Sequence, residues 1–296
     1  MNEPKIISDF IDHTPLIGDP ETTLAAFKNI KLRRFPAPVE DIEWLKYLGH
    51  GNEGHVYLAR INRGHPVAMK VFWHASRPPP DIIPKSKCIG GGNYYLHKTF
   101  PFKTESRIVD LMQKIAAAMS EVEKNPGQPI MIVRGPKERQ VAKENVYAFS
   151  KERREEYSKM GRTSSQPFLP KFPRFPECKG WLMLKNSDLP EVDPPLPKRP
   201  DRIGWSPVIV YEYVPEAEVN FAFIQEFLDF FYELGFVIDI DVKNWRGGRL
   251  VDMNDIRLPF DRRWFPEAVF VRNAEDLEWF DVEKEPLGHK IHPLIS

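Results

Sequence analysis

The stretch GHGNEGHV, from Gly49 to Val56, decides the fold, because it sets three glycines and a valine in the pattern GxGxxGxV between two strand-like segments. Glycine at Gly49, Gly51 and Gly54 would let backbone N–H groups approach phosphate oxygens that a side chain would keep away. Glycines with this spacing also occur in hairpin turns. The pattern alone therefore leaves a phosphate-binding loop and an ordinary turn open.

The segments around this stretch predict an antiparallel meander followed by a helix. Residues 44–49, 56–61 and 66–73 read as strands, with the turn NRGH between the last two. Apolar residues then recur at three- and four-residue steps from Thr104 to Lys124, which predicts an amphipathic helix with one stripe facing the sheet.

A single lysine interrupts the most apolar of these strands. Lys70 ends the run Val67-Ala68-Met69-Lys70. A charge inside an apolar strand is costly to bury, so Lys70 needs an anionic partner. The alternative is a lysine at the edge of the sheet whose ammonium group reaches solvent.

The rest of the chain divides by composition. Residues 1–40 read as an N-terminal extension with a helix at 21–30, capped by Asp19 before Pro20. Residues 125–200 are charged and proline-rich, with a helix at about 142–160 and a short strand at 181–186, and we expect this insertion to pack little onto the core. A buried strand at 207–214 and a phenylalanine-rich helix at 219–234 follow. Residues 236–254 then read as a strand-loop-strand unit.

Composition limits the possible partners and compartments. Hydrophobic residues make up 42% of the 296-residue chain, and its formal net charge is zero, so no basic field indicates nucleic acid or an anionic membrane. Two cysteines are too few for a disulfide scaffold, and the N-terminus does not resemble a signal peptide. No apolar run approaches the roughly 18 residues of a membrane span. We expect an intracellular protein, cytoplasmic or nuclear.

Together these features resemble the protein-kinase-like superfamily, whose glycine-rich loop and VAIK lysine match 49–56 and Lys70. The resemblance implies an ATP site built from Gly49, Gly51, Gly54, Val56, Ala68 and Lys70. In that family the lysine pairs with a helix glutamate, for which Glu105 is the matching residue. Glu105 could instead be an ordinary acid near a helix N-terminus.

Two further segments extend the resemblance. The strand at 208–214 resembles the one that leads to the kinase hinge, with Tyr211 in the gatekeeper position and Glu212 to Val214 offering backbone groups to adenine. Asp239, Asn244 and Asp252 follow the chain order of the kinase catalytic and metal-binding residues. The resemblance implies that Asp239 orients an acceptor hydroxyl, while Asn244 and Asp252 hold Mg²⁺. A polar loop of solvated acids is the alternative.

The chain also departs from the kinase pattern. The His-Arg pair expected before Asp239 is Val237-Ile238, and an expected phosphate-facing lysine is Asp241. The chain ends too soon after residue 267 for a full C-terminal lobe. These differences disfavour ordinary protein phosphorylation. The motif GHGNEGHVYLARI, the phrase PECKGWLML and the short step from Asn244 to Asp252 resemble, over about residues 42–260, a fungal kinase-like family named after a kinetochore subunit.

The sequence thus predicts an α+β, kinase-like, two-lobed fold with a truncated C-terminal lobe. Residues 41–214 would form the N-lobe, with about five strands and one helix besides the 125–200 insertion. Residues 215–296 would form the reduced C-lobe, with the catalytic-loop hairpin and a tail. One hypothesis is a protein that binds ATP and Mg²⁺ and transfers phosphate to an unknown acceptor. The other is a pseudokinase scaffold that binds protein partners through the insertion, as a kinetochore subunit would.

Overall fold

A seven-stranded mixed sheet forms the centre of the computed structural model, which describes residues 9–51, 53–72, 101–159, 171–193, 204–238, 244–276 and 290–292. In order across the sheet its strands are β1 (Ile11–Pro15), β2 (Leu32–Arg34), β6 (Cys178–Lys185), β8 (Trp205–Glu212), β5 (Pro66–Phe72), β4 (Gly54–Ile61) and β3 (Ile42–His50). The pairs β1–β2 and β2–β6 are parallel, and the other pairs are antiparallel. The α+β class is confirmed, although the expected five strands are seven because the N-terminal extension adds β1 and β2.

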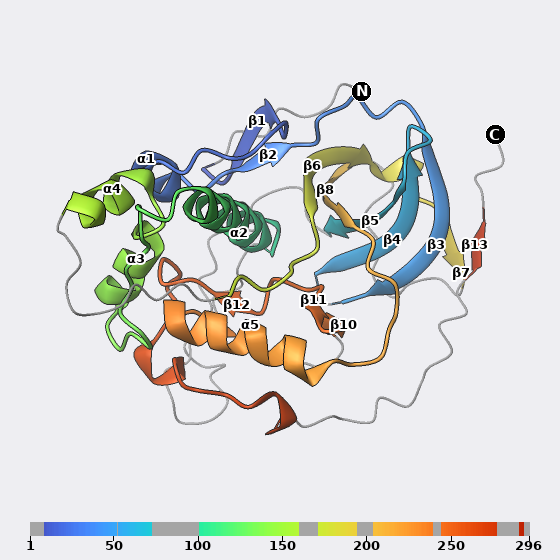
Figure 1. Ribbon diagram of the computed structural model, residues 1–296. Coiled ribbons are helices and arrows are strands. Elements are labelled where there is room, and N and C mark those ends of the chain that lie inside the picture. The colour runs from blue at the N-terminus through green and yellow to red at the C-terminus, as the bar shows by residue number, and fades with distance from the viewer. Residues whose placement is uncertain are drawn as a thin grey trace, which may run out of the picture.

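Helices cover one side of this sheet (Figure 1). They are α1 (Leu24–Lys28), α2 (Pro101–Lys124), α3 (Arg139–Tyr147), α4 (Lys151–Lys159) and α5 (Phe221–Leu234), with short 3-10 turns at Asn186–Asp188, Pro266–Ala268 and Ala274–Asp276. Figure 1 shows α2 beside the sheet, with α5 below it in this view and α1, α3 and α4 grouped at the end of α2. The long helix was predicted correctly except for its first turn.

The described residues also form three small two-stranded ladders. They are β9 (Val237–Ile238) with β12 (Ile256–Arg257), β10 (Trp245–Arg246) with β11 (Arg249–Leu250), and β7 (Glu191–Asp193) with β13 (Lys290–His292). The β10–β11 hairpin turns through Gly247 and Gly248, whose φ angles are 55° and 80°. Two consecutive left-handed residues favour glycine, so the predicted hairpin between Asn244 and Asp252 is present.

Side chains alternate between the two faces of the sheet, and this alternation sets the direction of Lys70. On β5, Val67, Met69 and Val71 pack into a cluster on one face. Ala68 and Phe72 contact the larger cluster on the opposite face, which includes α2 and α5. Lys70 lies between Ala68 and Phe72 in this alternation and therefore faces the helices.

Three expectations about helices and packing were wrong. Thr23, not Asp19, caps α1, since the Thr23 hydroxyl accepts the Ala26 N–H. The helix predicted at 142–160 is two helices, and the 125–200 segment contributes Val146, Phe149 and Trp181 to the fully buried core. Proline and charge content misled because the described charged side chains of this segment, apart from Arg154, are exposed or half-buried while the sparse apolar residues point inward. Arg154 is buried and paired with Glu121.

The buried face of α5 also differs from the prediction. Val219 and Phe223 were expected in the core, but they are 41% and 49% exposed. Asn220 caps the helix, accepting the Phe223 N–H with its side chain, so Val219 precedes the first turn. The later residues Phe227, Phe230, Phe231 and Leu234 are buried as predicted, and Gly235 ends the helix with a φ of 78°.

Candidate functional site

A buried ion pair joins the sheet to α2. Lys70 Nζ lies 2.6 Å from Glu105 Oε2, and the Glu105 side chain is fully buried. Burial alone would lower the pKa of Lys70, but the negative charges of Glu105 and Asp252 outweigh it and raise that pKa. The anionic partner required by a cation on β5 is therefore Glu105, and the predicted pair is confirmed.

Tyr211 holds the second oxygen of the same carboxylate. It lies on β8 opposite Ala68, and its hydroxyl donates to Glu105 Oε1 at 2.6 Å. Burial, followed by the charge of Glu105, raises the pKa of Tyr211 well above its ordinary value, so the phenol keeps its proton. Glu105 is thus fixed by two donors from neighbouring strands, an arrangement that gives it one orientation.

Asp252 supplies a second carboxylate to Lys70. Its Oδ1 lies 2.9 Å from Lys70 Nζ and also accepts the backbone N–H of Asn254 at 3.1 Å. The Asp252 side chain is 36% exposed, whereas Lys70 is buried beneath it. Asp252 therefore lies at the boundary between the buried pair and solvent. It is the aspartate to which the resemblance to kinases assigns Mg²⁺ binding.

Asn254 and Glu53 complete the cluster, and the sequence did not single out either of them. The Asn254 side-chain amide donates to Glu105 Oε2 at 2.5 Å and to a Glu53 carboxylate oxygen. Burial raises the pKa of Glu53 to about 7; the charge of Lys70 acts to lower that pKa, and the charges of Glu105 and Asp252 act to raise it further. The glutamate inside the GNEG turn was the available signal, but only the folded hairpin brings it over Asp252 and Asn254.

Three carboxylates of this cluster could together hold a divalent cation. Oxygens of Glu53, Glu105 and Asp252 lie within 4.8 Å of one another. Within the described part of the chain, Asn254 Oδ1 is also buried without a hydrogen-bond partner. Carboxylate and amide oxygens are the ligands that Mg²⁺ and Ca²⁺ prefer, so this donor set fits a hard cation.

The glycine-rich stretch forms the β3–β4 hairpin above this cluster. Val56 is paired with Lys70 across β4 and β5, and the Gly51 N–H donates to the Gly54 carbonyl at 3.1 Å. A Cβ at Gly54 would lie 2.0 Å from the Val71 carbonyl oxygen, so packing alone requires glycine there. A Cβ at Gly49 or Gly51 would meet nothing within 4 Å. Gly49 nevertheless has a φ of 144°, so Gly51 is the glycine that neither backbone angle nor packing explains.

The backbone at the end of β8 differs from the kinase hinge that the sequence predicted, in which Glu212 to Val214 would offer free backbone groups to adenine. The backbone N–H of Glu212 donates to the Glu177 carbonyl at 2.7 Å and is not free for an adenine edge. The Glu212 carboxylate binds Arg249 at 3.0 Å. Burial acts to raise the pKa of Glu212, but hydrogen bonds from the Glu177 backbone and Arg249 lower it overall. Val214 is buried, 8% exposed.

The three residues predicted for catalysis and metal binding are not all placed together. Asp239 lies outside the described residues, as do Asp241 and Lys243. Asn244 is buried, and its side-chain amide donates to the carboxylate of Asp255, while its backbone carbonyl accepts the Val251 N–H at 2.7 Å. Asn244 therefore reaches the cluster through the backbone beside Asp252 rather than by a hydrogen bond to Lys70 or Glu105.

Comparison with known proteins adds no relative: no protein-family model, no curated protein and no solved structure matches the chain. Among the residues that the structure describes, no helix combines the length and the apolar character needed to cross a bilayer. Fold and site together define a mixed α+β protein with a buried lysine–carboxylate cluster under a glycine-rich hairpin.

Proposed function

We propose that the chain is a kinase-like protein that binds ATP with Mg²⁺ at the cluster of Lys70, Glu105 and Asp252. The observation that carries the proposal is a buried lysine held by two carboxylates beneath a glycine-rich hairpin. Such a lysine is oriented to meet phosphate oxygens, with Glu105 fixing its position. Gly51, which packing does not require, places no side chain at the hairpin tip that would obstruct a phosphate group.

The charges of the site bear on the form in which a nucleotide would bind. Lys70 carries one positive charge, whereas Glu105 and Asp252 carry two negative charges, and Glu53 adds part of a third near neutral pH. A bare triphosphate would meet net repulsion. A divalent cation reverses this balance, because it neutralises phosphate and carboxylate charge together. ATP binding should therefore require Mg²⁺.

The residues fit a bound Mg²⁺ in a specific way. Asp252 and Glu53 would hold the ion, with Asn244 as the further ligand that the resemblance implies; when bound, the ion would neutralise the charge that develops on the phosphates. Asp239 would orient an acceptor hydroxyl and receive its proton. Lys70 would keep its proton throughout, because its pKa is raised by its two carboxylate neighbours.

A thermal-shift titration tests the proposal. Because a ligand that binds only the native state raises its apparent stability, ATP with Mg²⁺ should raise the Tm, and ATP with excess EDTA should not. Asp252→Ala should abolish the Mg²⁺-dependent shift. Glu43→Ala, which removes an exposed acid paired with Arg60, is the control and should leave the shift unchanged. No shift in the unmutated protein at millimolar Mg·ATP contradicts the proposal.

A pseudokinase scaffold, of the kind that a kinetochore subunit would be, is the second candidate. It is favoured by the fact that Lys70 and Glu105 already bind each other without a ligand, and that the Asn254 amide nitrogen also donates to Glu105. On this hypothesis the cluster is a structural clamp between β5 and α2. A stable complex recovered from cell extract by the unmutated protein, together with no Mg·ATP shift, supports the scaffold over the nucleotide-binding protein.

A further inference from the structure

A cavity of about 870 Å³ opens beside α2 and borders the lysine–carboxylate cluster, because Tyr211, which donates to Glu105, is part of its lining. Its walls are one face of α2, the N-terminal segments at 16–20 and 33–36, and residues 172–179, which lead into β6. Its volume falls within the range of about 300–1,000 Å³ that is typical of small-molecule sites. Neither Lys70, Glu105 nor Asp252 lines it, so an occupant would not compete directly with one bound at that cluster.

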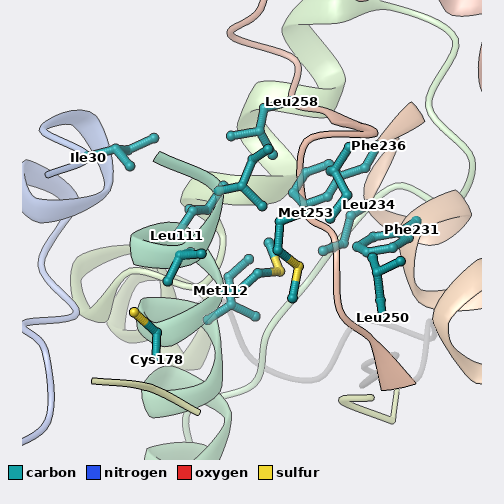
Figure 2. Close-up of a cluster of buried hydrophobic side chains, with 14 of the residues drawn as sticks. Ile30, Leu111, Met112, Cys178, Phe231, Leu234, Phe236, Leu250, Met253 and Leu258 are labelled. Carbon is teal, nitrogen blue, oxygen red and sulfur yellow. The ribbon is translucent and has the colours of Figure 1, made fainter. Parts of the chain in front are cut away.

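The floor and the α2 wall of this cavity are mainly apolar, with Gln113 and Ser120 as the polar residues that α2 contributes. Met112 and Met253 are buried at its base, among the side chains between α2 and the strand β11 that Figure 2 shows. The α2 wall presents Ala116 and Ala117, whose short side chains leave the space open. Phe172 and Phe175 pack against the core from the opposite loop.

Polar groups deep in the lining already have partners inside the protein. Gln113 donates its amide to the Cys178 carbonyl at 2.9 Å, and the Tyr211 hydroxyl donates to Glu105. These groups do not require hydrogen bonds from an occupant. The interior therefore offers mainly apolar contact. It favours a ligand with a large hydrocarbon or aromatic body, because removing apolar surface from water stabilises the complex.

The rim of the cavity carries an excess of positive charge. Its cations are Arg33, Arg174 and Lys179, against the two acids Asp19 and Glu177. Lys179 is paired with Glu177 at 3.1 Å. Arg174 lies 3.8 Å from the carboxylate of Glu212, which is outside the lining. Among the described residues, Arg33 is therefore the rim cation that has no carboxylate partner within ion-pair distance.

Arg33 is the cation best placed to meet an anion. Its guanidinium donates to the carbonyl oxygens of Ile17 at 3.0 Å and Gly18 at 2.9 Å, which fix its position without neutralising its charge. The charge of Arg33 acts to lower the pKa of Asp110, but Asp110 forms its own buried ion pair with Lys114 at 2.5 Å. A guanidinium held by carbonyls keeps further N–H donors for a carboxylate or a similar group.

We propose that this cavity binds a small amphipathic acid, whose apolar body lies against Ala116 and Ala117 and whose single anionic head group pairs with Arg33. Two of the three walls come from the N-terminal extension and the 125–200 segment. The site is therefore a property of these additions to the sheet and does not depend on nucleotide binding.

Isothermal titration with sodium dodecanoate below its micelle concentration tests this proposal, and dodecyltrimethylammonium serves as a cationic probe of equal chain length. We expect one dodecanoate per chain and binding of the cationic probe at least about tenfold weaker, since a charge-assisted hydrogen bond contributes about that factor. Arg33→Gln should weaken dodecanoate binding by about tenfold. Arg60→Gln, an exposed arginine on β4 outside the cavity, is the matched control and should bind as the unmutated protein does.

A filling substitution locates the binding site. Ala117→Phe should remove dodecanoate binding, because the ring would occupy the cavity; Ser120→Leu, on the same wall, serves if Ala117→Phe does not fold by circular dichroism. Equal affinity for the two probes, unchanged binding by Arg33→Gln or by the filling variant, or no dodecanoate binding at all overturns the proposal.

Discussion

The hydroxyl of Tyr211 and the carboxylate of Glu105 meet at 2.6 Å, so a residue of β8 and a residue of α2 are joined inside the core. The other Glu105 oxygen is held by Lys70 from β5. One fully buried carboxylate thus connects two central strands to the long helix, and removing any of its partners should be felt as lost stability.

Replacing Tyr211 by phenylalanine tests the hydroxyl alone. Tyr211→Phe leaves Glu105 Oε1 buried without its donor, and we expect the free energy of unfolding to fall by about 1–3 kcal/mol. Tyr213→Phe is the control, because the structure gives the Tyr213 hydroxyl no hydrogen bond among the described residues. Urea unfolding of both variants measures the difference, and equal stability of the two would refute a structural role for the Tyr211 bond.

Replacing one partner of the Lys70–Glu105 ion pair should lower the free energy of unfolding more than replacing both partners. Lys70→Met leaves Glu105 as an uncompensated buried charge, which typically costs about 3–5 kcal/mol of stability. The double variant Lys70→Met/Glu105→Leu should recover part of that loss. Lys171→Met breaks an exposed pair with Glu226 and should change stability by less than about 1 kcal/mol. If the double variant is less stable than Lys70→Met alone, the pair is not the source of the loss.

Glu53 predicts a dependence of stability on pH. Burial raises its pKa from 4.5 to about 7 in the folded protein. Between these values the native state holds a proton that the unfolded state releases, so the contribution of Glu53 to the free energy of unfolding falls as pH rises from 4.5 to about 7 and is constant above that. Glu53→Gln should remove this fall while preserving an acceptor for Asn254.

The comparison with the unmutated protein isolates Glu53. Burial also raises the pKa of Asp110, to about 6, but this group is present in both proteins and cancels in the difference. Unfolding free energies measured from pH 5 to pH 8 should show Glu53→Gln gaining stability relative to the unmutated chain as pH rises. A flat difference across that range is incompatible with a raised pKa at Glu53.

The two glycines at the hairpin tip should respond differently to alanine. Gly54→Ala forces a Cβ to within 2.0 Å of the Val71 carbonyl oxygen, and we expect a loss of about 1–3 kcal/mol or more. Gly51→Ala meets nothing within 4 Å and should leave stability nearly unchanged. If the hairpin contacts phosphate, Gly51→Ala should weaken Mg·ATP binding without lowering the Tm of the free protein, whereas unaltered binding argues against that contact.

If the protein transfers phosphate, its turnover should depend on Asp239, whereas its binding of ATP should not. Asp239→Ala is expected to retain Mg²⁺-dependent ATP binding and to lose ATPase or autophosphorylation activity, because Asp239 would orient the acceptor while Asp252 holds the metal. Titration calorimetry and an activity assay on the same preparation separate the two effects. Unchanged turnover in Asp239→Ala excludes this residue as the group that orients the acceptor.

The part of the site that was predictable from sequence depends on local rules. A cation in an apolar strand needs a partner, and side chains alternate across a strand, so the orientation of Lys70 follows from its neighbours on β5. The turn at Gly247 and Gly248 was predictable for a similar reason, because two adjacent glycines suit a left-handed hairpin turn.

The features of the fold and the site that were not predicted depend on contacts between segments that are distant in the sequence. Glu53 and Asn254 meet only because the β3–β4 hairpin lies over the segment after β11, and no local pattern encodes that approach. The packing of Val146 and Phe149 was missed because the average polarity of a segment conceals a few inward-facing residues. The hydrogen bond from the Glu212 N–H was also missed. Its acceptor is the carbonyl of Glu177, which precedes β6 in a segment that the sequence assigned to an insertion.

The position of β6 has a consequence for how the chain can fold during synthesis. β2 is paired on one side with the short β1 and on the other with β6, through Arg34 and Trp181. At about 5–20 residues per second, a ribosome would expose β2 on the order of ten seconds before its inner partner is made. The inner edge of β2 must stay unpaired, or be shielded by a chaperone, until residue 185 has left the exit tunnel. We therefore expect the sheet to be completed late in translation rather than strand by strand.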